Sequence, residues 1–200
     1  MNTAEKCKRW AMGIVLGVVS LALAACGGMP QTAAVSDATF YTVRDSLGRE
    51  VVLAKQPQRV VLLTASFVNM MHAVGGDFAA WANSPGAEGA AYARGKKTVG
   101  YAYQVDMEAL LREEPDLVIG LLGLHNRLLQ PLAENHIPFL LLSLASFEDV
   151  KRAVAILSDV SGRHAEGQAL IAGMEQDMEA TAAAVPHEAY SFAVIHGTAQ

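Results

Sequence analysis

Cysteine is almost absent from this 200-residue chain, which contains only Cys7 and Cys26. Cys7 lies inside an apolar N-terminal segment that we expect to be removed, and Cys26 follows directly after that segment. If Cys26 is modified there, no thiol remains for a disulfide, a thiolate metal site or a catalytic nucleophile. We therefore expect packing alone to stabilise the fold.

Positive charge is also scarce, with 15 Lys and Arg residues against 20 Asp and Glu. Residues 1–25 carry three of the basic residues and one of the acidic ones, so the rest of the chain has a formal charge near −7. Nucleic acid binding requires a basic surface, and we expect no nucleic acid partner.

The motifs of several enzyme classes are missing as well. The chain has no Gly-x-x-x-x-Gly-Lys phosphate loop, no Gly-x-Ser-x-Gly elbow and no His-Glu-x-x-His pair. Its six histidines share no metal-ligand spacing. The acids Asp106, Glu108, Glu113 and Glu114 are interpreted as one solvated helix face. We expect neither an enzyme nor a bare zinc or manganese site.

The longest apolar run begins the chain. Three basic residues precede it, and small residues stand before Cys26. About 15 apolar residues are fewer than the roughly 20 that a membrane-spanning helix needs, so residues 1–25 are predicted to be a signal peptide. Leu23-Ala24-Ala25-Cys26 also resembles the bacterial lipobox. This resemblance implies that Cys26 is lipidated and that the protein is exported and anchored to the cell membrane.

The next segments indicate a tether and then a folded body. Residues 26–39 are small, polar and unpatterned, which is typical of a flexible tether. Two short β-type runs, residues 40–43 and 51–53, flank the turn-forming residues 45–48 and predict a hairpin.

Buried strands then alternate with helices. Continuous apolar runs predict strands at residues 59–63, 116–120 and 139–142, with a short strand at 79–82. Helices are predicted at residues 66–74, 106–113 and 127–135, and residues 83–98 are predicted to be a loop. This alternation predicts an α/β fold, a Rossmann-like parallel-sheet lobe over residues 40–146.

After the lobe the pattern changes. Residues 147–161 and 164–184 are two helical stretches separated near Ser161 and Gly162. Residues 187–200 begin a new strand, which cannot bury its faces without neighbours.

Two groups of residues carry a family resemblance. Residues 45–53, Asp-Ser-Leu-Gly-Arg-Glu-Val-Val-Leu, precede Pro57-Gln58-Arg59. Val99-Gly100 precedes Glu108 and the Pro-Asp-Leu-Val-Ile sequence at 115–119. In this order they resemble the TroA-like periplasmic binding proteins of ABC importers for iron-siderophore complexes, haem and cobalamin. The resemblance covers roughly residues 40–195.

The resemblance implies two α/β lobes that are joined by a long rigid helix and hold the ligand between them. Residues 147–186 would be the connecting backbone helix, and residues 187–200 the first strand of an absent C-terminal lobe. Either the gene is truncated or the chain is a fragment, or the protein is a half-receptor that pairs with another chain. The implied function is that of a substrate-binding lipoprotein, which captures an iron complex (siderophore or haem) or cobalamin and delivers it to the permease. The alternative is a surface adhesion or interaction lipoprotein that uses the same lobe without a small ligand.

Fold logic places the ligand beyond the carboxyl ends of the strands. Tyrosine offers a flat ring for a macrocycle or catecholate and an oxygen that can bind ferric iron. The alternative role of Trp81 is to complete the sheet. The alternative for His125 is that it caps the next helix or is solvated. The candidate ligand-binding residues are Ser66, Phe67, Trp81, Tyr92, Tyr101, Tyr103 and His125.

Two candidates carry roles that the resemblance implies. In haem-binding members a tyrosine directly after Val-Gly can ligate the iron, so Tyr101 is a metal ligand only if haem is carried, and otherwise it packs in its loop. Glu108 matches a glutamate that docks the permease, and its alternative role is that of an ordinary acid at a helix start. Apart from the N-terminal lipid we expect no covalently bound cofactor, and haem, a ferric siderophore or cobalamin would be present only as the transported ligand.

Overall fold

The structure is a computed structural model that describes residues 39–84 and 89–185. The predicted signal peptide, the lipidation of Cys26, the tether up to residue 38 and the strand at 187–200 lie outside the described residues. Among the described helices, none combines the length and the apolar character needed to cross a bilayer.

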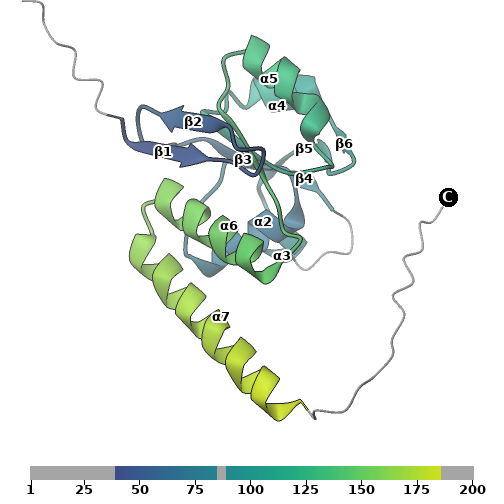
Figure 1. The fold of residues 1–200 in the computed structure, drawn as a ribbon. Coiled ribbons are helices and arrows are strands. Elements are labelled where there is room, and N and C mark those ends of the chain that lie inside the picture. The colour runs from purple at the N-terminus through teal and green to yellow at the C-terminus, as the bar shows by residue number, and fades with distance from the viewer. Residues whose placement is uncertain (1–38, 85–88, 186–200) are drawn as a thin grey trace, which may run out of the picture. The chain divides into compact units, whose positions relative to one another are not determined.

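A six-stranded sheet forms the centre of the lobe, with the strand order β6-β5-β4-β3-β7-β8 (Figure 1). Four neighbouring pairs are parallel, and β6 pairs antiparallel with β5. The predicted α/β class with a parallel sheet is confirmed. The strands are β3 (Val60–Leu62), β4 (Ala80–Asn83), β5 (Lys97–Tyr101), β6 (Gln104–Val105), β7 (Leu117–Leu121) and β8 (Phe139–Leu142).

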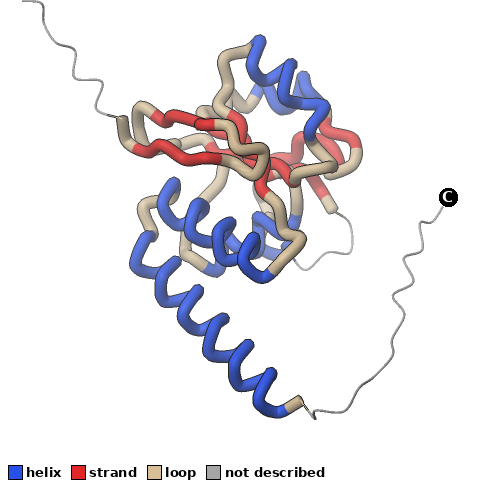
Figure 2. The backbone as a smooth tube through the Cα atoms, in the orientation of Figure 1, coloured by secondary structure: helices blue, strands red, loops and turns tan. Residues whose placement is uncertain are grey.

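Helices cover both faces of the sheet, so the lobe has two cores (Figure 2). Successive side chains of a strand point to opposite faces. Val60 and Leu62 therefore join one core, while Val61 and Leu63 join the other. The first core packs against α2 (Ala65–Ala73) and α6 (Phe147–Val160), and the second against α4 (Met107–Arg112) and α5 (Leu129–Glu134).

The predicted hairpin is present as β1 (Tyr41–Arg44) and β2 (Glu50–Leu53). Its turn is built on the buried carboxylate of Asp45, which accepts the backbone N–H groups of Leu47 and Arg49 and the guanidinium of Arg49. Arg49 also donates to the carbonyl of Phe139 at 3.0 Å, and the N–H of Ser46 donates to the carbonyl of Leu141 at 2.9 Å. The turn therefore fastens the hairpin to the edge strand β8.

The predicted loop at residues 83–98 is partly wrong. Its C-terminal part begins β5, and a short helix, α3 (Gly89–Tyr92), precedes it. The side chains of Lys97 and Thr98 are exposed, and only Val99 of this strand is buried. A strand with a single buried residue gives no apolar run, which explains why the sequence pattern missed it.

The two helical stretches predicted at 147–161 and 164–184 are present as α6 (Phe147–Val160) and α7 (His164–Ala184). Ser146 and Asp149 form a capping box that begins α6, and Gly162, with φ +70°, follows its end. Val154, Leu157 and Val160 of α6 are buried in the core. This helix therefore packs against the core of the lobe.

The second helix, α7 (His164–Ala184), folds back along α6. Lys151 of α6 pairs with Glu175 of α7 at 2.7 Å, while Ser158 meets Gly167, so the two helices run antiparallel. Gly167 is buried at the contact, and most of the other side chains of α7 are exposed. The two helices thus form an antiparallel hairpin with its turn near Gly162.

The approach of the two helices generates a prediction about glycine. Replacing a helical glycine by alanine normally stabilises a helix by about 1 kcal/mol. A Cβ atom at Gly167 would lie 2.1 Å from Oγ of Ser158, whereas one at Gly173 would meet nothing within 4 Å. We expect Gly173→Ala to raise the free energy of unfolding, and Gly167→Ala to lower it by about 1 to 3 kcal/mol, as overpacking does. Urea unfolding checks both variants, and equal stabilisation by the two would contradict the contact.

Candidate functional site

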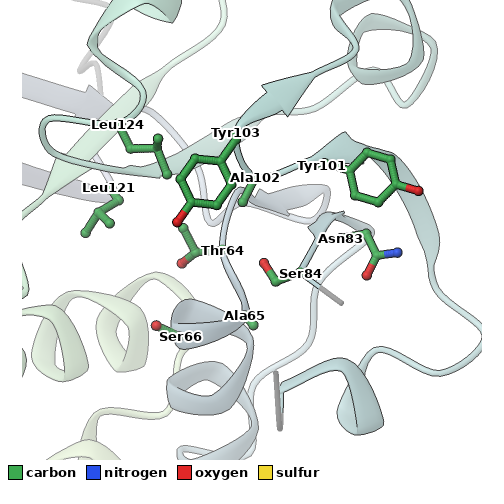
Figure 3. Close-up of a pocket in the computed structure, with 10 residues that line it drawn as sticks. All are labelled: Thr64, Ala65, Ser66, Asn83, Ser84, Tyr101, Ala102, Tyr103, Leu121 and Leu124. Carbon is green, nitrogen blue, oxygen red and sulfur yellow. The ribbon is translucent and has the colours of Figure 1, made fainter. Parts of the chain in front are cut away.

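A cavity of about 540 Å³ opens where β3, β4, β5 and β7 end (Figure 3). The carboxyl ends of parallel strands meet at one edge of a sheet, and this is where open α/β folds bind ligands. Three loops and the start of α2 line the cavity. The lining residues are Thr64, Ala65, Ser66, Asn83, Ser84, Tyr101, Ala102, Tyr103, Leu121 and Leu124.

The start of α2 forms one wall. Thr64 is the N-cap of this helix, and its side-chain oxygen accepts the N–H of Phe67 at 3.4 Å. Ser66, one of the predicted ligand-binding residues, is exposed and lines the cavity. Ser84, which follows β4, adds another hydroxyl. This wall offers small polar groups and no bulky side chain.

The two tyrosines lie on a tight turn. Tyr101 pairs with Gln104 across β5 and β6, so Ala102 and Tyr103 form the tip. We call residues 101–104 the tyrosine turn. Tyr101 is 54% exposed and Tyr103 79% exposed, and both line the cavity as predicted.

Gly100 is needed for this turn. Its φ of +90° is unfavourable for other residues, and a Cβ atom there would come within 2.6 Å of the carbonyl oxygen of Gln104. The Val-Gly-Tyr sequence therefore places a tyrosine at the rim because glycine allows the strand to turn back.

His125 does not face the cavity, and this part of the prediction is wrong. Its side chain is fully buried. Nδ1 accepts the N–H of Leu121 at 2.9 Å, and Nε2 lies 2.8 Å from the carbonyl oxygen of Ala102. Burial lowers the pKa of His125, and the positive charge of Arg127 acts in the same direction. Of the expected alternatives, His125 is the N-cap residue of the short 3₁₀ helix Asn126–Leu128, but its side chain makes no cap bond and is not solvated.

Three further predicted residues lie away from the cavity. Phe67 and Trp81 are buried in the core between the sheet and α2, because the helix and strand turn those positions inward. Trp81 thus has its alternative role in completing the sheet. The ring of Tyr92 stacks on His72, with the centroids 3.8 Å apart, and does not line the cavity.

The structure also adds residues that the prediction did not single out. Thr64, Asn83, Leu121 and Leu124 line the cavity, and each lies in or beside a loop that follows a strand. The position of these loops was the available signal. Which residue of a loop points inward depends on the turn geometry.

The cavity wall has no charge among the described residues that line it. Its polar groups are hydroxyls and one amide, and its apolar groups are the two leucines and the tyrosine rings. No group of three or more metal-ligating side chains occurs within residues 39–84 and 89–185. The described site can therefore contact a flat or hydroxyl-rich molecule.

Glu108 lies on a different surface. It is in the first turn of α4, behind the N-cap Asp106, and its side chain is 91% exposed. Its Oε2 lies 3.8 Å from Nη1 of Arg112, a long ion pair between two exposed side chains on the same helix. Glu113, by contrast, is mostly buried and pairs with Lys97 at 3.0 Å. The four acids are therefore not one solvated face.

Comparisons with known proteins fit this geometry. A model of the family described as "Periplasmic binding protein" matches residues 60–200. No curated protein matches the chain.

Three solved structures share the fold at a TM-score of 0.64. BauB, a siderophore-binding protein bound to two molecules of acinetobactin and ferric iron, is 18% identical. PiuA, an iron uptake ABC transporter substrate-binding protein from Streptococcus pneumoniae, is 22% identical, and MolA from Haemophilus influenzae, bound to molybdate, is 16% identical. Each match covers 72% of this chain and 53% of the other chain, so this chain spans about half their length.

The division between rim and core residues generates a prediction. Phe67→Ala removes a fully buried ring and should lower the free energy of unfolding by about 4 kcal/mol. Tyr103→Ala removes an exposed ring and should change it by less than about 0.5 kcal/mol. Chemical denaturation measures both values. A Tyr103→Ala loss as large as that of Phe67→Ala would place this tyrosine in the core.

Proposed function

The chain belongs to the periplasmic binding protein family, and on this premise we propose that it captures a small molecule in the cavity at the strand ends and delivers it to an ABC permease. The observation that carries the proposal is the pair of exposed tyrosines on a turn that lines this cavity. Large exposed rings beside a pocket provide binding area at little entropic cost.

We propose a metal chelate as the ligand: a ferric siderophore, haem or cobalamin. Two proteins with the same fold support an iron complex as the ligand. BauB is described as bound to a complex of acinetobactin and ferric iron, and PiuA as an iron uptake substrate-binding protein. The tyrosine rings suit the flat parts of such ligands, and the hydroxyls of Ser66 and Ser84 suit their polar edges. The protein binds and releases its ligand without breaking bonds.

If haem is the ligand, Tyr101 is the proposed axial group. Its phenol is exposed at the cavity rim, and phenolate is a known haem ligand. If the ligand is a siderophore or cobalamin, the same ring provides contact area alone.

We further propose that the protein is exported and held at the membrane by a lipid on Cys26. The sequence Leu-Ala-Ala-Cys at 23–26 supports this, as does the exported character of the family. A lipid anchor keeps the receptor close to its permease.

The ligand prediction is tested by thermal unfolding with haemin, ferric siderophores and cobalamin. A ligand that binds only the folded state raises the melting temperature by mass action. For haemin we also expect a Soret shift that Tyr101→Phe abolishes and the matched control Tyr92→Phe retains, since Tyr92 lies outside the cavity. If none of these ligands stabilises the chain, the ligand proposal is wrong, and the adhesion or interaction lipoprotein becomes the better explanation.

Glu108 is the proposed contact with the permease. A carboxylate in the first turn of a helix is favoured by the helix dipole and stays available for an arginine of a partner. Glu108→Arg should abolish uptake of labelled ligand by cells that contain the permease, while ligand binding is unchanged. Glu179→Arg on α7, an exposed charge reversal away from α4, is the control. Loss of binding together with uptake would contradict a docking role.

A further inference from the structure

The backbone of the tyrosine turn is held by two side chains of the segment that follows β7. Nε2 of His125 lies 2.8 Å from the carbonyl oxygen of Ala102, and the guanidinium of Arg127 donates to the carbonyl of Tyr103 at 2.6 Å. These are the two tip residues of the turn. A third bond runs from the N–H of Ala102 to the carbonyl of Asn83 at 3.0 Å. The tip is thus fixed through its main chain while its tyrosine rings stay exposed.

The segment that supplies these side chains is itself well fixed. The N–H of His125 donates to the carbonyl of Leu121 at 3.0 Å, and the N–H of Gly123 donates to the side chain of Asn126 at 2.9 Å. Gly120 makes room for the histidine, because a Cβ atom there would lie 3.0 Å from Cβ of His125 and 2.8 Å from the ring of Phe139. Contacts within its own segment therefore fix the position of the imidazole, independently of the tyrosine turn.

The hydrogen-bond partners of His125 are compatible with only one protonation state of its imidazole. Nδ1 faces an N–H donor, so it must carry no proton, and Nε2 faces a carbonyl, so it must carry one. A proton added to Nδ1 would point at the N–H of Leu121, and that bond would be lost. The charged group nearest to His125 is the guanidinium of Arg127. The titratable side chains of the tyrosine turn are Tyr101 and Tyr103. From β8, the uncharged ring of Phe139 packs beside Gly120 and His125. No carboxylate of the described residues pairs with His125 to stabilise its charge.

We propose that His125 and Arg127 are positioning residues that clamp the tyrosine turn, and that protonation of His125 loosens the clamp, because it breaks the bond from the N–H of Leu121 that fixes the imidazole while Nε2 still donates to Ala102. The clamp itself is inferred from the hydrogen bonds of His125 and Arg127 to the turn. Its consequence for ligand retention rests on the proposed function, under which the cavity would hold its ligand less tightly in acid.

The direction of the pH effect follows from the lowered pKa of His125. Above the ordinary histidine pKa of about 6.5, the imidazole is neutral in both folded and unfolded chains, and the clamp is intact. As the pH falls below that value, the unfolded chain takes up a proton that the folded chain resists. The clamp therefore weakens progressively toward acid.

Amide hydrogen exchange of the full chain, followed by NMR, tests the clamp without any ligand. The N–H of Leu121 reports the bond to Nδ1, the N–H of Ala102 reports the turn, and the N–H of Val118, which donates to the carbonyl of Pro138, is the reference. After correction for intrinsic exchange, the protection of Leu121 relative to Val118 should fall by up to about tenfold per pH unit between about pH 6.5 and the lowered pKa of His125 in the folded chain, and it should level off below that pKa. Unchanged relative protection between pH 7.5 and pH 4.5 would overturn the loosening in acid.

Variants separate the clamp from a merely structural role. His125→Gln keeps a donor for Ala102 and an acceptor for Leu121 but cannot be protonated, so protection should stay high at both pH values. His125→Leu should lower the protection of the Ala102 N–H at both pH values. Arg127→Ala should also lower this protection, by an amount that does not depend on pH. The exposed His136→Asn is the matched control and should behave as the unmodified chain does.

Each outcome bears on one proposal. If His125→Gln retains the acid dependence, another group controls the turn and the switch is wrong. If Arg127→Ala and His125→Leu both leave Ala102 as protected as before, the clamp is wrong. If His125→Leu does not fold, His125→Gln and Arg127→Ala still decide both points. A chain that binds no chelate but shows this exchange pattern would refute the proposed function and support the clamp.

Discussion

The lobe depends on one constraint, the burial of β3 on both faces while it pairs with β4 and β7. Such a strand needs a helix layer above and below it, because its side chains point alternately to the two faces. The parallel pairing also brings the ends of β3, β4 and β7 to one edge of the sheet. The cavity arises at that edge, so the placement of the site follows from the packing of three apolar residues and their neighbours.

The sequence was most informative where burial is continuous. The runs that became β3, β7 and β8 are apolar on both faces, and they were predicted because nothing but a doubly covered strand explains them. β5 was missed because it buries only Val99. The two helices after β8 were predicted with nearly the observed bounds, but their sequence does not reveal that Val154 and Leu157 pack on the lobe while most of α7 is exposed.

The site was predicted at the level of loops and not at the level of side chains. Tyr101 and Tyr103 were predicted because they follow Val-Gly in a loop at the carboxyl ends of the strands, and the structure adds the positive φ of Gly100 as the reason for the turn. Phe67 and Trp81 were misplaced because the direction of a side chain near the end of a strand depends on where the helix begins. The burial of His125 depends on the carbonyl of Ala102, which is 23 residues away in sequence. No local pattern contains that contact.

The two walls of the cavity differ in chemistry. The wall at the start of α2 lies at the positive end of a helix dipole and presents Thr64 and Ser66, so it favours negatively charged or hydroxyl-rich groups. The opposite wall presents tyrosine rings, which favour flat apolar surfaces. Because the described lining has no charged side chain, the charge of an anionic chelate would be balanced only by the weaker dipole. Within the described residues, shape and aromatic contact therefore contribute more to selection than ion pairing does, and the accuracy with which the tyrosine turn is held becomes part of specificity.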